Sequence, residues 1–126
     1  MQCIAPDDRC LTIVIAAFNE AEALPALQPR IATALSLAEA AGLEARVLYV
    51  DDGSRDGTWD ILRGFAAGDP RVALLRLSRN FGKEAALTAG LDRVERGAAF
   101  ILDADGQDPP ELLPRFVEQW REGFDD

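Results

Sequence analysis

The sequence predicts an α/β fold in which a Rossmann-like parallel sheet carries helices on both faces. Four short apolar runs alternate with amphipathic stretches along the 126 residues. The runs are almost continuously apolar, which is typical of strands that helices cover on both sides. Right-handed crossovers between successive runs then give a doubly wound sheet. Such sheets usually have five or six strands, so we expect residues 1–126 to form part of a larger unit.

The first half of the chain predicts two strands and the helix between them. Residues 11–17 (LTIVIAA) form an apolar run that predicts the first buried strand. Residues 22–41 are rich in Ala and Leu and predict a helix that ends at Gly42, because glycine commonly terminates helices. Residues 46–50 (RVLYV) predict the second strand.

The same alternation continues after the second strand. Residues 58–67 predict a short helix, for which either Asp56 or Thr58 can serve as the N-cap. Residues 71–77 (RVALLRL) predict the third strand.

The last third of the chain predicts two helices and one strand. Residues 83–96 predict a helix that Gly97 ends, and residues 98–102 (AAFIL) predict the fourth strand. Pro110 suits the first turn of a final helix, because its missing N–H has no partner there in any case. The apolar face of that helix would comprise Leu112, Leu113, Phe116, Val117 and Trp120.

Composition and charge exclude several classes of protein. The formal net charge is −9, and 48% of the residues are hydrophobic, which is enough for a core and unlike a disordered acidic tail. An acidic surface repels phosphate backbones, so we expect no nucleic-acid partner. The chain has no histidine, which excludes a Ser-His-Asp triad, a Cys-His pair and any His-ligated zinc site within these residues.

Cysteine usage and hydropathy bear on the cellular location. Cys3 and Cys10 are the two cysteines, and the chain has neither a Cys-x-x-Cys motif nor a signal peptide. We therefore expect free thiols in a reducing, cytoplasmic compartment. The longest nearly apolar run, residues 11–18, is too short to span a bilayer, so any membrane contact would come from parts missing from this chain.

Each predicted strand is followed by a polar cluster. These clusters lie at residues 18–20 (FNE), 51–54 (DDGS), 78–83 (SRNFGK) and 103–108 (DADGQD). Strand-to-helix loops are usually polar, so one cluster alone indicates little. Parallel strands bring their carboxyl ends to the same edge of a sheet, where α/β folds bind ligands. Four clusters together therefore indicate a site at this edge.

The Asp103-x-Asp105 pair is the sharpest of these features. Alternate residues at the end of a strand point the same way, so the two carboxylates converge and repel each other unless a cation lies between them. Oxygen ligands suit Mg²⁺ or Mn²⁺, and Gln107 continues the alternation. A solvated acidic loop is the alternative. An EF-hand fits badly, because Gly106 falls at loop position four and Pro114 at position twelve.

The other clusters leave alternatives open. Asp51 and Asp52 could form a turn or could bond a ribose or a base edge. Glu20 could accept a hydrogen bond from a base or could stabilise the dipole of the following helix. Arg79 and Lys83 could contact phosphate or could belong to a solvated helix start. The chain has no Gly-x-Gly-x-x-Gly fingerprint for a dinucleotide.

The same segments resemble a known family. Residues 13–20 (IVIAAFNE) and 50–58 (VDDGSRDGT) resemble the "VIPAYNE" and "VDDGSxDGT" motifs of family 2 glycosyltransferases, which have the GT-A fold. Residues 78–87 (SRNFGKEAAL) and 103–111 (DADGQDPPE) are similar to motifs of the branch that loads sugars onto polyprenyl phosphates, such as dolichyl or undecaprenyl phosphate. The resemblance covers nearly the whole chain in the right order.

The resemblance implies roles for individual residues. Those that would contact the sugar nucleotide are Ala16, Phe18, Glu20, Tyr49, Asp51, Asp52, Asp103, Ala104 and Asp105. Ala16, Phe18 and Glu20 would line the base pocket, with Tyr49 and Asp51 beside the base and ribose and Asp52 assisting. Asp103 and Asp105 would be the catalytic pair. Asp105 and Gln107 would hold Mg²⁺ or Mn²⁺ on the diphosphate, with Asp103 near the ribose, the donor sugar or the metal.

Three positions depart from the family pattern. Ala16 stands where the motif usually has Pro, Phe18 where it has Tyr, and Gly106 where it has Leu. Phe18 removes a hydroxyl from the pocket, and Gly106 loosens the metal loop. These departures bear on donor affinity and base choice more than on the fold.

The implied function is metal-dependent, inverting sugar transfer from a UDP-sugar or GDP-mannose to a polyprenyl phosphate. Residues 1–126 would then be the nucleotide-sugar-binding half of the GT-A domain, inactive alone and, in the full-length protein, in the cytoplasm or on the cytoplasmic face of the membrane. The alternative is a non-catalytic nucleotide-binding or interaction domain that retains the half-fold. A nucleotidyltransferase is disfavoured, because no Gly-rich phosphate loop follows the first strand.

Overall fold

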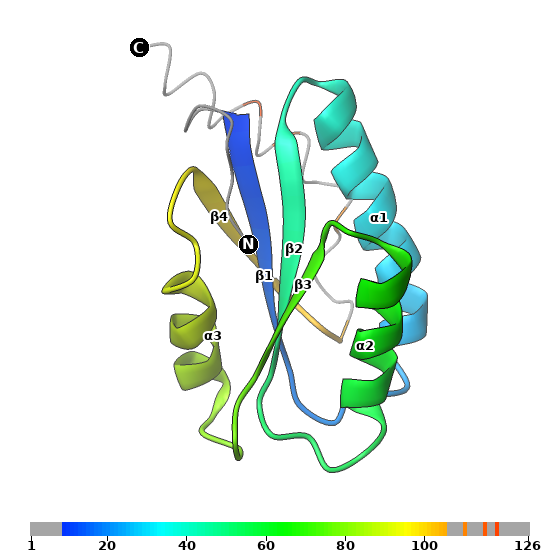
Figure 1. The fold of residues 1–126 in the computed structure, drawn as a ribbon, viewed down its shortest axis with the longest axis vertical. Coiled ribbons are helices and arrows are strands. Elements are labelled where there is room, and N and C mark those ends of the chain that lie inside the picture. Colours follow the sequence, from blue (N-terminus) through cyan, green and yellow to red (C-terminus); the bar gives the residue numbers. More distant parts are fainter. Residues whose placement is uncertain (1–8, 106–109, 111–114, 116–117, 119–126) are drawn as a thin grey trace.

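The protein is a parallel α/β sheet flanked by helices (Figure 1). The computed structural model describes residues 9–105, 110, 115 and 118. The strands are β1 (Cys10–Ala17), β2 (Glu44–Asp51), β3 (Val72–Arg76) and β4 (Ala98–Asp103). The helices are α1 (Leu24–Ala40), α2 (Thr58–Gly68) and α3 (Lys83–Leu91). All strand pairs are parallel, in the order β3-β2-β1-β4, which confirms the predicted fold class.

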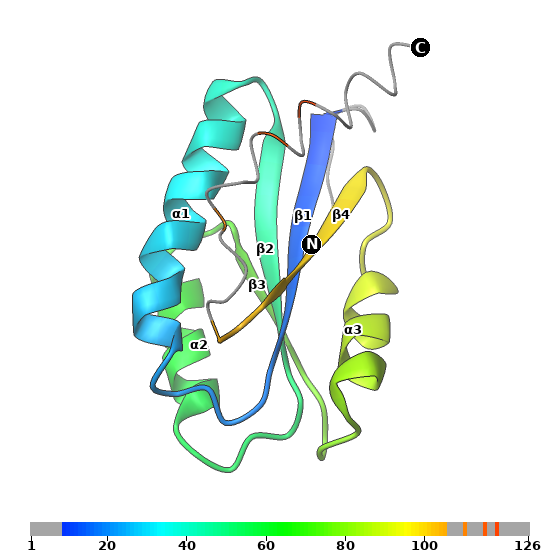
Figure 2. The ribbon, with the colours of Figure 1, turned by 180° about the vertical axis from the view of Figure 1, so that it is seen from behind.

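The helices divide between the two faces of the sheet. Helices α1 and α2 cover one face, and α3 covers the other (Figures 1 and 2). Side chains along β1 alternate accordingly: Ile13 and Ile15 pack with α1, whereas Val14 packs with the α3 side. At Gly90 of α3, a Cβ atom would lie 2.7 Å from Val14 Cγ1 and 2.8 Å from Val50 Cγ2. Glycine therefore lets α3 approach the sheet closely.

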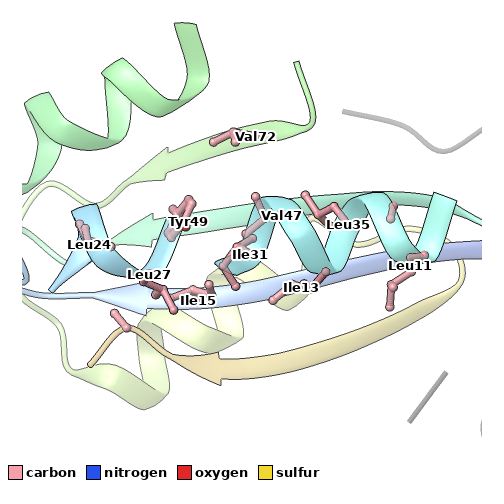
Figure 3. Close-up of a cluster of buried hydrophobic side chains, with 14 of the residues drawn as sticks. Leu11, Ile13, Ile15, Leu24, Leu27, Ile31, Leu35, Val47, Tyr49 and Val72 are labelled. Atoms are coloured by element: carbon pink, nitrogen blue, oxygen red, sulfur yellow. The ribbon is translucent and has the colours of Figure 1, made fainter. Parts of the chain in front are cut away.

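The larger core lies between α1 and the sheet (Figure 3). Leu24, Leu27, Ile31 and Leu35 follow helical spacing, and all four are buried against the central strands. Fully burying an aliphatic side chain of this size stabilises a fold by about 1.5–3 kcal/mol. This stripe holds α1 against β1 and β2 and so fixes the loop that leads from β1 into the helix.

Several element boundaries differ from the predictions. Helix α1 begins at Leu24 rather than at residue 22, and α3 ends at Leu91 rather than at residue 96. After α3, Arg93 N–H donates to the Gly90 carbonyl and Val94 N–H to the Leu91 carbonyl. These bonds span three residues, so the chain leaves the α-helix in tighter turns. Of the predicted final helix, the structure describes only residues 110, 115 and 118.

Cys10 forms a disulfide, so the prediction that it is a free thiol is wrong. The absence of a Cys-x-x-Cys motif argues against one short redox loop only and does not exclude a longer one. Cys3 lies outside the described residues. Within the part of the chain that the structure describes, no helix is long and apolar enough to cross a membrane.

Candidate functional site

A pocket of about 200 Å³ opens at the carboxyl edge of the sheet, beside the ends of β1 and β4. Its walls come from all four polar clusters that the sequence places after the strands. The lining residues are Ala16, Ala17, Phe18, Glu20, Asp52, Asn80, Lys83, Asp103, Ala104 and Asp105. The parallel sheet thus brings the four loops to one place, as the strand order predicts.

The loop after β1 is tied to the loop after β2. Asn19 has a positive φ of 53°, and its N–H donates to Ser54 Oγ at 2.9 Å while its Oδ1 accepts from the Arg55 N–H at 2.9 Å. The Glu20 N–H donates to Thr58 Oγ1 at 2.9 Å. These bonds hold the backbone of Phe18 and Glu20 at the pocket wall.

Glu20 precedes α1 by four residues and accepts backbone hydrogen bonds from Ala23 and Leu24 through its carbonyl. Its side chain lines the pocket and not the first turn of the helix. The interpretation of Glu20 as a helix-dipole residue is therefore wrong, because the helix starts later than its sequence pattern indicates. The N-cap of α2 is Gly57 and neither Asp56 nor Thr58, although Asp56 Oδ1 accepts from the Thr58 N–H at 2.9 Å.

Asp52 is buried and anchors the start of α3. One carboxylate oxygen accepts from the Phe81 N–H at 2.8 Å, and the other accepts from the Gly82 N–H at 3.0 Å and from Asn80 Nδ2 at 3.1 Å. The neighbouring Gly53 has a φ of +71°, and a Cβ there would lie 2.3 Å from the Arg79 carbonyl carbon. The loops after β2 and β3 are therefore in direct contact.

Asp51 points to the opposite face of the sheet from Asp52, as consecutive strand residues do. It is fully buried, and its Oδ1 accepts from the Ser54 N–H at 3.1 Å. Its Oδ2 has no hydrogen-bond partner among the described residues and lies 3.9 Å from Arg76 Nε. A buried carboxylate oxygen without a donor is costly, which marks it as a candidate ligand contact.

Tyr49 also faces the α1 side and does not line the pocket. Its hydroxyl donates to Gln28 Oε1, its ring packs near Phe65, and burial raises the pKa of the phenol well above its usual range. The structure thus brings together seven of the predicted sugar-nucleotide contacts and leaves Tyr49 and Asp51 outside the pocket. The seven are Ala16, Phe18, Glu20, Asp52, Asp103, Ala104 and Asp105.

Like charges gather in this pocket. Burial raises the pKa of Glu20, and the nearby charges of Asp105, Asp56 and Asp103 raise it further. Asp103 forms an ion pair with Lys83, the first residue of α3. A site with this excess of carboxylates attracts a cation.

The side chains of the pocket fit a divalent metal ion whose coordination sphere is completed by oxygens of a bound ligand. Within the described ranges, no group of three or more acidic, histidine or cysteine side chains could hold a metal. Mg²⁺ usually takes only one or two carboxylates, with phosphate oxygens and waters as its remaining ligands. Asp103 and Asp105 supply such a pair at one pocket, and Gln107 lies outside the described residues.

Three residues that line the pocket, Ala17, Asn80 and Lys83, are not among the contacts that the sequence predicts. The sequence gives no role to Asn80, and it fits Lys83 equally to a phosphate contact and to a solvated helix start. Both line the pocket because Asp52 fixes the loop that carries them. The polar run directly before the third helix was the available signal.

Comparison with known proteins gives one family. The sequence model described as "Glycosyl transferase family 2" matches residues 12–126. The chain is 40% identical over 115 residues to a bactoprenol glucosyl transferase of Shigella phage SfX, covering 91% of this chain and 37% of that protein. It is 41% identical over 117 residues to an undecaprenyl-phosphate 4-deoxy-4-formamido-L-arabinose transferase of Pseudomonas fluorescens, covering 92% and 33%. The chain thus spans about a third of the length of these relatives.

Solved structures share the fold. The mannosyltransferase PcManGT from Pyrobaculum calidifontis, in complex with GDP-Man and Mn²⁺, superposes with a TM-score of 0.66 at 27% identity, covering 81% of this chain and 30% of that one. TarS residues 1–349 of S. aureus give the same TM-score at 18% identity, covering 86% and 31%, which supports the fold alone.

Proposed function

Since this chain belongs to glycosyl transferase family 2, we propose that it supplies the donor-binding part of an enzyme that transfers a sugar from a nucleoside diphosphate to a polyprenyl phosphate. The transfer is metal-dependent and inverts the configuration at the sugar C1. Relatives named for bactoprenol and undecaprenyl phosphate support this acceptor class. Such a lipid acceptor would place the reaction at the cytoplasmic face of a membrane.

The convergence of Glu20, Asp103 and Asp105 on one pocket is the observation that carries the proposal. Without a ligand, this arrangement brings together carboxylates that repel one another. A nucleoside diphosphate with its divalent cation relieves that repulsion, because the cation is shared between the carboxylates and the phosphate oxygens.

Asp51 supports the position of the nucleoside. Strand β2 lies beside β1, and β1 lies beside β4, so a nucleotide along the carboxyl edge can extend from Asp51 to Asp103. The unbonded Asp51 Oδ2 is buried in this structure, so a ribose hydroxyl or a base N–H would donate to it only after the side chains that cover it move. Phe18, which is 42% exposed at the pocket, offers a ring face toward the nucleoside.

Asp103 and Asp105, with Gln107, are the residues that would hold Mg²⁺ or Mn²⁺. The ion would neutralise the charge that develops on the departing nucleoside diphosphate. The protein's own contribution is to orient the donor, because correct placement of the reacting groups supplies a large part of a catalysed rate. A phosphate acceptor is already an anion, so the reaction needs no general base, and the lack of histidine is consistent with this chemistry.

Thermal unfolding with nucleotide and metal tests the proposal. UDP or GDP should raise the melting temperature in Mn²⁺ or Mg²⁺ and not in EDTA. A ligand at a hundredfold excess over its Kd stabilises the native state by about 2.7 kcal/mol. The Asp105→Asn variant should fold normally and lose this shift, because Asp105 is exposed and its charge is part of the repulsive cluster. Equal shifts with and without EDTA would contradict the metal role, and unfolding of Asp105→Asn would make the acidic pair structural.

A transfer assay separates an enzyme from a non-catalytic nucleotide-binding domain. The protein expressed from its complete open reading frame is incubated in membranes with labelled UDP-glucose or GDP-mannose, undecaprenyl phosphate and Mn²⁺. We expect label in the lipid fraction. Nucleotide binding without label in the lipid, from a well-folded protein and with every donor, would favour the non-catalytic domain or another acceptor.

A further inference from the structure

Lys83 has a special place in the charge distribution of this protein. Of the 13 basic residues in the sequence, it is the only lysine. It is also the only basic residue among the described residues that line the pocket, which Glu20, Asp103 and Asp105 line as well. Among the described residues of this pocket, an anionic ligand therefore meets one cation, Lys83.

The backbone beneath Lys83 is fixed by buried contacts. Lys83 is the first residue of α3, and the preceding Gly82 turns the chain with a φ of +101°. The buried Asp52 holds the N–H groups of Phe81 and Gly82. The attachment point of the side chain is thus held in place, whereas the side chain itself is 60% exposed.

One partner of Lys83 in this structure is Asp103, which is one of the two carboxylates of the proposed metal site. The ion pair lies at the surface, where water competes for both charges, so its partners can be exchanged. A lysine ammonium suits this exchange, because it is a compact charge with three donors on a flexible stem.

We propose that Lys83 binds the diphosphate of the donor, and that its ammonium stays paired with Asp103 until the donor binds. In the ligand-free protein, the ammonium neutralises part of the carboxylate cluster. When a nucleoside diphosphate enters with its divalent cation, Asp103 turns from Lys83 to the cation, and the ammonium donates to diphosphate oxygens. This inference rests on the proposed function, and it adds a competition between Lys83 and the metal for Asp103.

The competition predicts effects of opposite sign for the Lys83→Met variant. Mn²⁺ alone should bind more tightly than in the wild type, because Asp103 no longer has an ammonium partner. UDP or GDP in the presence of Mn²⁺ should bind about tenfold more weakly, as expected when a charge-assisted contact to phosphate is lost. Electron paramagnetic resonance of free Mn²⁺ measures the first quantity, and isothermal titration calorimetry measures the second.

Two control variants separate charge from structure. Lys83→Arg keeps the charge and should retain more of the nucleotide affinity than Lys83→Met. Arg79→Met removes a nearby charge that lies over the Phe81 ring, 4.5 Å from its centroid, and that does not line the pocket. It should leave both affinities unchanged. A general loosening of the helix start would weaken both kinds of binding in Lys83→Met.

The single lysine allows a second test on the wild-type chain. Lys83 is acetylated with a limiting reagent, and peptide mass spectrometry gives its rate, with the N-terminal amine as the internal reference. Mg²⁺ alone should speed acetylation by drawing Asp103 away, and Mg²⁺ with UDP or GDP should slow it by engaging the ammonium. This readout does not depend on whether a variant folds.

The outcomes distinguish this inference from the proposed function. A wild-type chain that binds neither UDP nor GDP with metal contradicts both. A chain that binds them with the same affinity after Lys83→Met, or with no protection of Lys83 from acetylation, contradicts this inference alone. Weaker binding of Mn²⁺ to Lys83→Met would also overturn it.

Discussion

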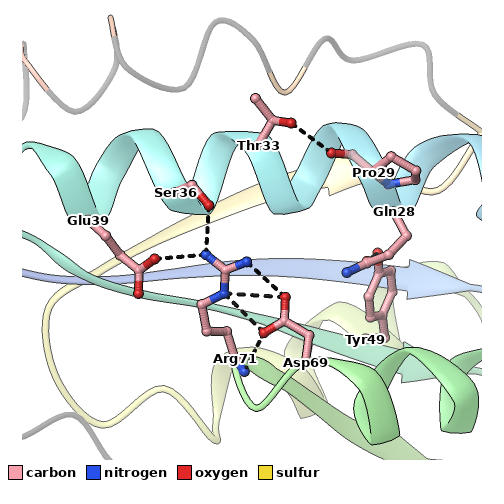
Figure 4. A network of polar contacts seen from close by, with 8 residues as sticks. All are labelled: Gln28, Pro29, Thr33, Ser36, Glu39, Tyr49, Asp69 and Arg71. Atoms are coloured by element: carbon pink, nitrogen blue, oxygen red, sulfur yellow. Dashed lines mark hydrogen bonds and ion pairs between the residues drawn. The ribbon is translucent and has the colours of Figure 1, made fainter.

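The two edges of the sheet differ in how their charged side chains are arranged: like charges gather at one edge, and opposite charges pair at the other. At the carboxyl edge, the carboxylates of Glu20, Asp103 and Asp105 share one pocket with Lys83, the one cation among its described lining residues. At the amino edge, Arg71 lies between Asp69 and Glu39 (Figure 4), donating to Asp69 Oδ2 and to Glu39 Oε1 at 2.8 Å each. Burial and neighbouring charges raise the pKa of Glu20, whereas the hydrogen bond from Arg71 lowers the pKa of Asp69.

The difference separates a carboxyl that stabilises the fold from carboxyls that, in the proposed function, bind a ligand. A carboxyl whose pKa is lowered favours the folded state at neutral pH, and one whose pKa is raised opposes it. The amino edge also has a hollow, of about 510 Å³, lined by Glu39, Glu44, Arg46 and Arg71 among others. Its charged groups form ion pairs with one another, so its size alone does not make it a binding site.

Among the variants that test this contrast, Arg71→Met should lower stability the most, because it removes the ion pairs of Arg71 with Glu39 and Asp69 at the amino edge. It leaves Asp69 and Glu39 without this donor, and hydrogen bonds to charged groups contribute about 1.5–3 kcal/mol each. Because the Arg71 side chain is only 21% exposed, water replaces these bonds incompletely. We expect a loss of about 1.5–3 kcal/mol in the free energy of unfolding, measured by urea titration, with unchanged binding of nucleotide.

Arg46→Met is the matched control for Arg71→Met. It removes the same charge from the same hollow, where Arg46 pairs with Glu44 at 3.2 Å, and should cost less because it breaks a single ion pair. If a fully folded Arg71→Met variant lost metal-dependent nucleotide binding, the two edges of the sheet would be coupled. The contrast between stabilising charges at one edge and binding charges at the other would then be wrong.

The Tyr49→Phe variant tests whether Tyr49 belongs to the pocket or to the protein interior. The resemblance to the family places Tyr49 beside the nucleotide, but in the structure its hydroxyl bonds Gln28 under α1. Loss of that bond should lower stability by about 0.5–1.5 kcal/mol and leave the Kd for UDP or GDP within twofold of wild type. Calorimetric titration and urea unfolding give the two numbers. A large loss of affinity with unchanged stability would return Tyr49 to the donor site.

Much of the fold could be predicted from the sequence, because each strand is an apolar run and each run ends in polar residues. Less of each boundary could be predicted. Residues 92–96 continue the helical pattern, but the chain leaves the helix after Leu91 in short turns. The disulfide of Cys10 could not be inferred from spacing, since the distance between two thiols depends on the folded backbone.

The sequence predicted that Asp103 and Asp105 lie together, and both line one pocket. Strand alternation does not account for this, because β4 ends at Asp103 and the intervening Ala104 lines the same pocket. Alternation puts Asp51 and Asp52 on opposite faces, but the sequence does not say which face the pocket occupies. The part that Asp52 plays in fixing Asn80 and Lys83 depends on a contact between two loops about 30 residues apart, which no local pattern encodes.

The smallest expected effect is a pH dependence at the amino edge. The pKa of Asp69 is lowered in the fold, first by the hydrogen bond from Arg71, from about 3.9 in an unfolded chain. Its contribution is therefore complete above about pH 3.9 and is lost as the pH falls through the folded pKa.

Asp69→Asn should cost about 0.5–1 kcal/mol at pH 7, and the same at pH 5. The gap between the two proteins should narrow as the pH falls below about 3.9 toward pH 3, because the carboxyl of the unfolded chain then takes up its proton while the lowered pKa keeps the folded carboxyl ionised. Urea unfolding at these three pH values measures the gap, in which the titration of groups common to both proteins cancels. A gap that widens toward acid pH would mean that the charge of Asp69 opposes folding, as the charge of Glu20 does, and that the bond from Arg71 does not stabilise it.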